Sequence, residues 1–153
     1  MSAVLRPVPA FEPMRDSDLR AVLDIEEAIY EFPWTLGNFR DSLRAGYACR
    51  VIREGRRVIG YAVLMLAAGE AHLLNLSVAA QSQRRGYGRS LLDNVVHAAR
   101  ENKAKVLFLE VRPTNEVGQR LYAGYGFRQI GVRRGYYPAR KGREDALVLA
   151  LEL

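Results

Sequence analysis

The chain has 153 residues, of which 49% are hydrophobic and 26% are charged, and these ordinary globular proportions argue against intrinsic disorder. One hydrophobic core fits this length, so we expect a single domain that covers residues 1–153. The net charge of +6 suits an anionic ligand or a ribonucleoprotein neighbourhood.

Membrane and metal-binding proteins are the classes that the sequence argues against. The longest apolar run, residues 58–69, is much shorter than the roughly 20 residues that a membrane helix needs. Cys49 is the only cysteine, which excludes an internal disulfide and a cysteine-clustered metal site. The first residues do not resemble a secretion signal. We therefore expect a cytoplasmic protein that binds no metal.

In chain order, residues 11–14 are a candidate first strand, and an amphipathic helix follows the potential capping residues at 16–18. Pro33 interrupts this helix, because the residue before a proline avoids the helical conformation. A second helix is expected from Thr35 to Gly46, where glycine favours a helix end. Residues 47–53 alternate and residues 58–66 are largely apolar, which predicts two antiparallel strands joined by a turn at 54–56.

The second half of the chain predicts a fourth strand at 71–78, a helix at 86–100 and a fifth strand at 106–111. Because the fifth strand is apolar on both faces and follows a helix, we expect it to pair in parallel with the fourth. A helix at 115–125, a sixth strand at 126–134, a loop at 135–143 and a seventh strand at 146–151 complete the pattern. The predicted fold class is α/β (α+β), with one mixed, mostly antiparallel seven-stranded sheet and helices on both faces.

A basic turn that contains two glycines joins the fourth strand to the next helix. The N-terminus of a helix has unpaired backbone N–H groups and roughly half a positive charge, so a diphosphate can bind there. Gly86 and Gly88 would let the ligand approach the backbone, and Arg84, Arg85 and Arg89 would supply counter-charge. The chain has no P-loop string, and Leu91 replaces the third glycine of a dinucleotide fingerprint. A solvated arginine-rich turn is the alternative interpretation.

This turn resembles the acetyl-CoA pyrophosphate loop of the GCN5-related N-acetyltransferases, the GNAT family. Other motifs resemble one branch of that family, the bacterial ribosomal-protein alanine N-acetyltransferases (RimI). They cover nearly the whole chain and comprise Phe32-Pro33-Trp34, residues 75–78, residues 83–88, Leu109-Glu110-Val111-Arg112, Asn115, Leu121-Tyr122, Gly126-Phe127, residues 133–138 and residues 142–146.

The resemblance implies two catalytic residues. Glu110 lies in an otherwise apolar strand, where burial would make it a more effective general base, although a salt bridge at the strand end is the alternative. Tyr122 matches the family's general acid, which protonates the departing thiolate; core packing is the alternative. The cofactor residues implied are Leu76, Ser77, Val78, Arg84, Arg85, Gly86, Tyr87, Gly88, Arg89 and Asn115.

Two aromatic-rich segments are candidates for substrate binding. We expect the loops at 30–34 and 134–138 to hold the first residues of an extended peptide through Tyr30, Phe32, Trp34, Tyr136 and Tyr137. The acidic side chains at positions 24, 27 and 31 could attract a basic tail, although a solvated acidic helix face is the commoner explanation of such a triplet.

The resemblance implies an enzyme that transfers an acetyl group from acetyl-CoA to the N-terminal alanine of ribosomal protein number eighteen of the small subunit. We expect direct transfer in a ternary complex, because no Ser-His or Cys-His pair suggests a covalent intermediate. The expected partner is the N-terminal peptide of that ribosomal protein, either free or on the ribosome. We expect no sequence-specific binding of nucleic acid. The alternatives are an acetyltransferase for small amines or for a broader range of N-terminal peptides, and a non-catalytic module that binds RNA or ribosomes.

Overall fold

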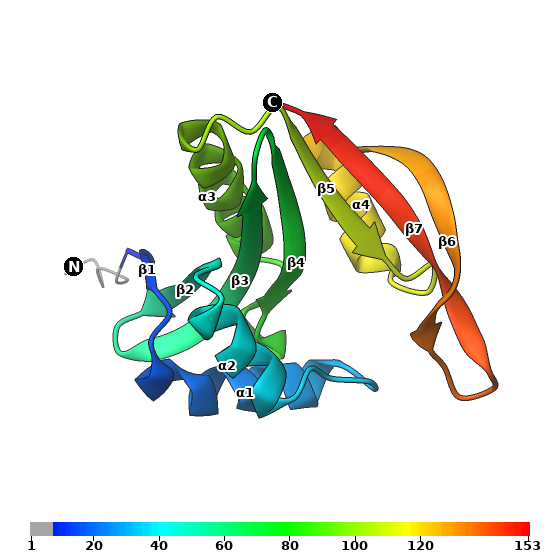
Figure 1. Ribbon diagram of the computed structural model, residues 1–153. Helices are drawn as coiled ribbons and strands as arrows, with labels where there is room; N and C mark the ends of the chain where they lie inside the picture. The colour runs from blue at the N-terminus through cyan, green and yellow to red at the C-terminus, as the bar shows by residue number, and fades with distance from the viewer. Residues whose placement is uncertain (1–7) are drawn as a thin grey trace, which may run out of the picture.

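The computed structural model describes residues 8–153 (Figure 1). The elements follow in the order β1 (Ala10–Pro13), α1 (Leu19–Ile29), α2 (Leu36–Arg44), β2 (Ala48–Glu54), β3 (Arg57–Ala67), β4 (Glu70–Val78), α3 (Tyr87–Glu101), β5 (Val106–Val111), α4 (Glu116–Tyr125), β6 (Arg128–Pro138) and β7 (Arg143–Glu152). Short 3-10 turns, Asp16–Asp18 and Ala80–Ser82, precede α1 and follow β4.

The seven strands form one sheet in the order β1-β2-β3-β4-β5-β7-β6. Only β4 and β5 pair in parallel, and every other pair is antiparallel. Helix α3 supplies the crossover between the two parallel strands. The predicted fold class, including the position of the parallel pair, is therefore confirmed. No helix within residues 8–153 has the length and apolarity to span a membrane.

Helices cover both faces of the sheet, as the alternation along β3 shows. Ala62 and Leu64 belong to the core that α3 and α4 cover, whereas Tyr61 and Val63 belong to the core under α1 and α2. Successive strand residues point to opposite faces, so an uninterrupted apolar strand is buried on both sides. Figure 1 shows α3 and α4 behind the sheet and α1 and α2 on its other side, over the first strands.

The sheet opens in its middle, between β4 and β5. Their pairing ends at Leu73 opposite Leu109, although β4 continues to Val78 and β5 to Val111. The two strands diverge from that point, as Figure 1 shows. The edge of β4 after Leu73 is therefore left without a partner strand, and its free backbone groups face the opening.

The hairpin formed by β6 and β7 corrects one prediction. Residues 135–143 were expected to be a loop, but β6 runs to Pro138 and β7 starts at Arg143, so only residues 139–142 connect them. The pairing register shifts between Arg133 and Tyr137, and Gly135 has a φ of +59° there. A bulge at a glycine thus interrupts the ladder without ending the strand. The second aromatic segment, residues 134–138, is consequently a strand.

Candidate active site

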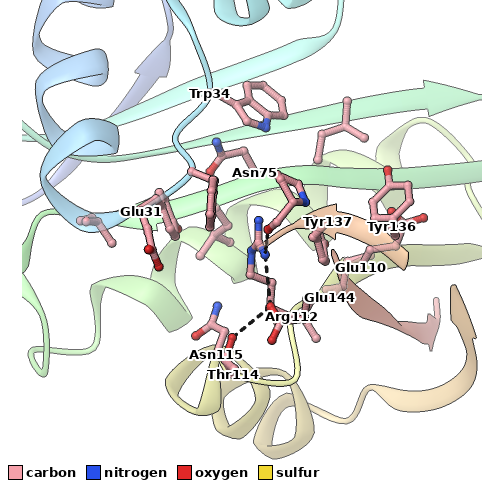
Figure 2. Close-up of a pocket in the computed structure, with 18 of the residues that line it drawn as sticks. Glu31, Trp34, Asn75, Glu110, Arg112, Thr114, Asn115, Tyr136, Tyr137 and Glu144 are labelled. Carbon is pink, nitrogen blue, oxygen red and sulfur yellow. Dashed lines mark hydrogen bonds and ion pairs between the residues drawn. The ribbon is translucent and has the colours of Figure 1, made fainter. Parts of the chain in front are cut away.

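A cavity of about 930 Å³ lies where β4 and β5 diverge. Its walls come from the end of α1 and the loop after it, the later parts of β4 and β5, the residues just before α4 together with Tyr122 in that helix, and the hairpin of β6 and β7. Figure 2 shows side chains from these segments pointing toward a common space. Both predicted catalytic residues, Glu110 and Tyr122, line it.

Glu110 reaches the cavity from β5. Its carboxylate accepts a hydrogen bond from Arg133 Nη1 at 2.7 Å, and its side chain is 26% exposed. The expectation of an enclosed carboxylate therefore needs correction, because the front face of β5 is not covered by a helix and an arginine from β6 reaches this side chain. Partial exposure leaves the carboxylate accessible to an amine or to a water molecule.

Tyr122 reaches the cavity from α4. Its ring packs edge-on against Phe127 at 5.6 Å, and the residue is 8% exposed. Burial raises the pKa of the Tyr122 phenol well above its usual value, and the nearby hydroxyls of Tyr30 and Tyr137 add to the shift. The hydroxyl forms no hydrogen bond with any of residues 8–153. Tyr122 therefore packs in the core, as one interpretation required, and it also has an unbonded, protonated hydroxyl, as a general acid requires.

Glu26 is a buried carboxylate in the wall of the cavity that sequence reasoning missed. It is 2% exposed and accepts hydrogen bonds from Trp34 N at 2.9 Å, Tyr61 Oη at 2.7 Å and Asn75 Nδ2 at 2.8 Å. The bond to Trp34 fixes the loop after α1, and the bond to Asn75 fixes β4. A buried charge is tolerated only with such partners.

The polar network continues from Asn75 through Ser77 to Tyr30. Ser77 Oγ donates to Asn75 Oδ1 at 2.8 Å and lies 2.7 Å from Tyr30 Oη. Burial is the main reason that the pKa of Tyr30 rises to about 12. The Tyr30 hydroxyl is therefore neutral and holds the end of α1 against β4.

Arg112, which follows β5, joins the two aromatic segments and was not predicted to do so. Its guanidinium lies 5.3 Å from the Phe32 ring and 4.3 Å from the Tyr137 ring. Its Nη1 donates to Pro138 O at 2.8 Å and to Glu144 Oε1 at 3.1 Å (Figure 2). These cation–π and hydrogen-bonding contacts fix the hairpin relative to the loop after α1.

The five predicted substrate residues, Tyr30, Phe32, Trp34, Tyr136 and Tyr137, all line the same cavity. Phe32 and Tyr136 are exposed, so they are available to a ligand. Burial raises the pKa of Tyr137, which leaves its hydroxyl protonated. Of the acidic side chains at 24, 27 and 31, only Glu31 lines the cavity, and it pairs with Arg140.

The basic turn at 84–89 leads into α3, as predicted, and its last three residues form the first turn of that helix. Arg84 has a φ of +64° and Gly86 a φ of +82°, and such left-handed residues turn successive N–H groups toward one side. The first helical bond runs from Ser90 N to Gly86 O, and within residues 8–153 no acceptor binds the N–H groups of residues 84–89. Unpaired donors at a helix N-terminus suit a diphosphate.

The side chains of this turn divide into two groups. Arg84, Arg85 and Arg89 are exposed and take part in no ion pair with the described residues. Tyr87, in contrast, donates to Glu54 Oε2 at 2.5 Å and so anchors the turn to the last residue of β2. A Cβ at Gly88 would lie 3.4 Å from Leu121 Cδ2, at the limit of ordinary van der Waals contact. The donors, the charge and the clearance fit a diphosphate.

The remaining predicted cofactor residues are Leu76, Ser77, Val78 and Asn115. Leu76, Ser77 and Val78 form the end of β4, beyond its pairing with β5. Leu76 also lines the cavity, and the Ser77 side chain is buried in the polar network. Asn115 lines the cavity, but its Oδ1 accepts from Gly118 N at 2.9 Å and caps α4. Its side-chain oxygen is therefore already occupied by a structural role.

The sequence profile of the acetyltransferase (GNAT) family matches residues 17–127, which include β4, the basic turn, β5 and α4. The chain belongs to the GNAT family of acetyltransferases. Membership of the GNAT family implies acetyl-CoA as the acetyl donor, and the basic turn and the open edge of β4 provide surfaces that fit it. Within residues 8–153, no cluster of three metal-ligating side chains is found.

Two curated relatives of this GNAT acetyltransferase match nearly its whole length. The [ribosomal protein bS18]-alanine N-acetyltransferase of Escherichia coli strain K12 is 32% identical over 140 residues, which are 92% of this chain and 95% of the relative. The protein of the same name from Haemophilus ducreyi is 34% identical over 143 residues, which are 93% and 99% of the two chains.

A solved structure matches the fold of this GNAT acetyltransferase equally well. The crystal structure of the ribosomal-protein-S18-alanine N-acetyltransferase from Escherichia coli superposes with a TM-score of 0.87 and 31% identity. The match covers 95% of this chain and 94% of that one. The predicted resemblance to this branch of the family is therefore confirmed.

Proposed function

We propose that this GNAT acetyltransferase transfers the acetyl group of acetyl-CoA to the N-terminal alanine of ribosomal protein bS18. The observation that supports this substrate is the match of 32–34% identity, over nearly the full length, to relatives that carry this name. A ribosomal substrate places the enzyme in the bacterial cytoplasm, where it acts on the free or ribosome-associated protein.

In this proposal, bound acetyl-CoA supplies an activated thioester carbonyl to the gap between β4 and β5. The N–H groups of residues 84–89 hold the diphosphate, and Arg84, Arg85 and Arg89 neutralise its charge. The free backbone groups of Leu76 to Val78 bind the arm that leads to the thioester.

The chemistry of the amine explains why a modest base is sufficient. An α-amine has a pKa of about 7.7 to 8.0, whereas a lysine amine has one of about 10.4, so its deprotonation near neutral pH costs roughly 3.4 kcal/mol less. Glu110 accepts the amine proton, directly or through a water molecule, and the free hydroxyl of Tyr122 protonates the departing sulfur. The raised pKa of Tyr122 ensures that this proton is present at neutral pH.

A direct transfer in a ternary complex fits the side chains that surround the cavity. Cys49 is buried under α1 and α2 and lines neither of the two cavities described for residues 8–153. Burial raises the pKa of its thiol to about 11, so the thiolate that a covalent route needs is scarce. The amine is therefore expected to attack the thioester itself.

Substrate profiling tests the proposal. The purified enzyme with acetyl-CoA is offered peptides that begin with alanine, matched peptides that begin with glycine, serine or methionine, polyamines and aminoglycosides. We expect kcat/KM to be highest for the alanine peptide with the bS18 sequence. A higher kcat/KM for a polyamine or an aminoglycoside would instead identify a small-amine acetyltransferase.

A further inference from the structure

A second cavity, of about 630 Å³, lies on the face of the sheet that α1 and α2 leave uncovered. We call it the sheet groove and define it by Met65, Glu70, His72, Phe108, Ile130 and Val148. The side chains of His72 and Phe108 stack at 5.3 Å, and Ile130 is 51% exposed. The floor of the groove is therefore largely apolar and accessible.

The sheet groove is continuous with the candidate active site. Residues that line both cavities come from the loop after α1, β4, β5 and β6, and they are Trp34, Leu73, Leu74, Leu109, Glu110, Tyr136 and Tyr137. Glu110, the proposed base, thus lies at the junction of the two. A chain whose first residue is at Glu110 can extend into the sheet groove without leaving the protein surface.

The other side of the active site is bridged by side chains. Arg140, in the connection between β6 and β7, pairs with Glu31 in the loop after α1, and both residues line only the first cavity. Arg112 between Phe32 and Tyr137 adds a second link between the same segments. Figure 2 shows Glu31 and Tyr136 on opposite sides of the cavity. The route past Tyr136 has no such bridge to the loop after α1, although Arg133, which pairs with Glu110 and lies 4.4 Å from the Tyr136 ring, also lines it.

We propose that the sheet groove binds the residues of the peptide substrate that follow the acetylated N-terminus. This inference rests on the proposed function and specifies which part of the substrate is recognised. From Glu110 to Val106, which pairs with Glu70, four strand residues span about 13 Å, enough for about four residues of extended peptide. Apolar side chains at alternate positions of the bound peptide pack on Phe108 and Ile130. A basic side chain near the far end of the peptide faces Glu70.

The test compares alanine peptides that share their first two residues. One peptide ends after about three residues, and two extend to about eight, with either apolar or serine side chains at the third to sixth positions. For the wild-type enzyme, we expect kcat/KM to be about fivefold higher for the long apolar peptide than for the short peptide or the serine peptide.

Variants on β6, together with one on β5, then test whether the peptide preference arises in the sheet groove. Ile130→Ser removes an apolar side chain from the sheet groove, whereas Val132→Ser removes one of similar exposure, 48%, that lines neither cavity. We expect Ile130→Ser, and more strongly Phe108→Ser, to lower the preference for the long apolar peptide, and Val132→Ser to retain it. Melting temperatures confirm that each variant is folded.

The outcomes separate this inference from the proposed function. Equal kcat/KM for all three peptides, with acetylation of each, would overturn the sheet groove as a peptide site and leave the acetyltransferase intact. Acetylation of none of them would refute the proposed function itself. A change of oligomeric state in Phe108→Ser, with the peptide preference retained, would assign the groove to contacts between copies of the chain and also overturn the inference.

Discussion

The two sides of the active site are built from different parts of the chain. On the cofactor side, the turn at 84–89 presents backbone N–H groups, and its arginines form no ion pairs with the described residues. On the peptide side, Glu26, Arg112 and Glu144 connect elements that are far apart in sequence. The first side is therefore built mainly from residues that are adjacent in the chain, with Tyr87 bonded to the distant Glu54, whereas the second depends on tertiary contacts throughout.

This difference matches the two ligands that we propose. A diphosphate is the same in every reaction, and backbone donors at a helix N-terminus recognise it whatever side chains are present. A peptide differs from one substrate to another, so side chains must define the space that it occupies. Substitutions on the two sides should accordingly change different kinetic constants.

The largest effect is expected where the two sides meet, at Glu110. Glu110→Gln removes the proposed base, and kcat should fall by about 10² to 10⁴. Glu152→Gln is the matched control, because Glu152 also pairs with an arginine across the same sheet and lies outside both cavities. Steady-state kinetics of peptide acetylation measures both. A kcat within threefold of wild type for a folded Glu110→Gln would exclude Glu110 as the base.

Tyr122→Phe tests the second catalytic group. It should lower kcat by about 10², because the ring packing is preserved while the proton donor is lost. Tyr125→Phe, on the same helix but outside both cavities, is the control. An unchanged kcat for Tyr122→Phe would reduce Tyr122 to a packing residue.

The raised pKa of Tyr122 also predicts a pH dependence. A raised pKa keeps the phenol protonated to higher pH, so loss of this proton should not lower kcat between about pH 8 and pH 10. Toward lower pH, kcat/KM should decline as the α-amine of the peptide becomes protonated, with a pKa of about 8. A wild-type pH profile measures both limbs, and a fall in kcat that begins near pH 8 would contradict the assignment.

Glu26→Ala perturbs the peptide side first, and its effect on the cofactor side is indirect, through the bond from Asn75 to Ser77 at the end of β4. It leaves the Trp34 N–H and the Asn75 amide without their acceptor, so the loop after α1 loosens and KM for the peptide should rise about tenfold. KM for acetyl-CoA should stay within twofold. Glu27→Ala, an exposed neighbour on α1, provides the control. A rise of both KM values together would show that the two sides are not independent.

Gly86→Ala perturbs the cofactor side alone. A Cβ at Gly86 meets no atom within 4 Å, but a φ of +82° costs an alanine about 1 kcal/mol, so the free turn should leave this conformation. Binding of acetyl-CoA must restore it, and KM for acetyl-CoA should rise by up to about fivefold. KM for the peptide should not change. Gly124→Ala is the control, because this glycine lies in α4 without a positive φ and with open space around it. The reverse pattern, with only the peptide KM altered, would refute the placement of the diphosphate.

The smallest effect is expected for Glu31→Gln. The side chains of Glu31 and Arg140 are 53% and 85% exposed, and exposed ion pairs contribute little because solvent screens them. KM for the peptide should change by less than about threefold, and the change should shrink as salt is added. A larger, salt-independent change would indicate that Glu31 contacts the substrate directly.

The position of the basic turn at the start of α3 could be predicted from the sequence because its signals are local. Glycines, arginines and a strand end are adjacent in the chain, and Thr35 likewise caps α2 through Asn38, three residues away. Burial of Glu26 could not be predicted, since its partners Tyr61 and Asn75 lie 35 and 49 residues further along. From the sequence alone, Glu26 cannot be distinguished from Glu27 and Glu31, because its partners are on strands that are distant in the chain.

In the hairpin of β6 and β7, Gly135 is a signal that could have predicted the full length of β6. Gly135 within an alternating segment is compatible with a bulge as well as with a loop, and the bulge keeps Tyr136 and Tyr137 in the sheet. The aromatic residues were correctly grouped near one cavity, but the roles of the catalytic, cofactor and substrate residues remain predictions.

The divergence of β4 and β5 has a consequence for the lifetime of the folded enzyme. A ligand that lies along the unpaired edge of β4 takes the place of a missing strand, and it binds only the native chain. The folded population should therefore track the supply of coenzyme A, with stability increasing as the logarithm of its concentration above the dissociation constant. Acetyl-group metabolism would then set how much of this protein escapes proteolysis as well as how fast it works.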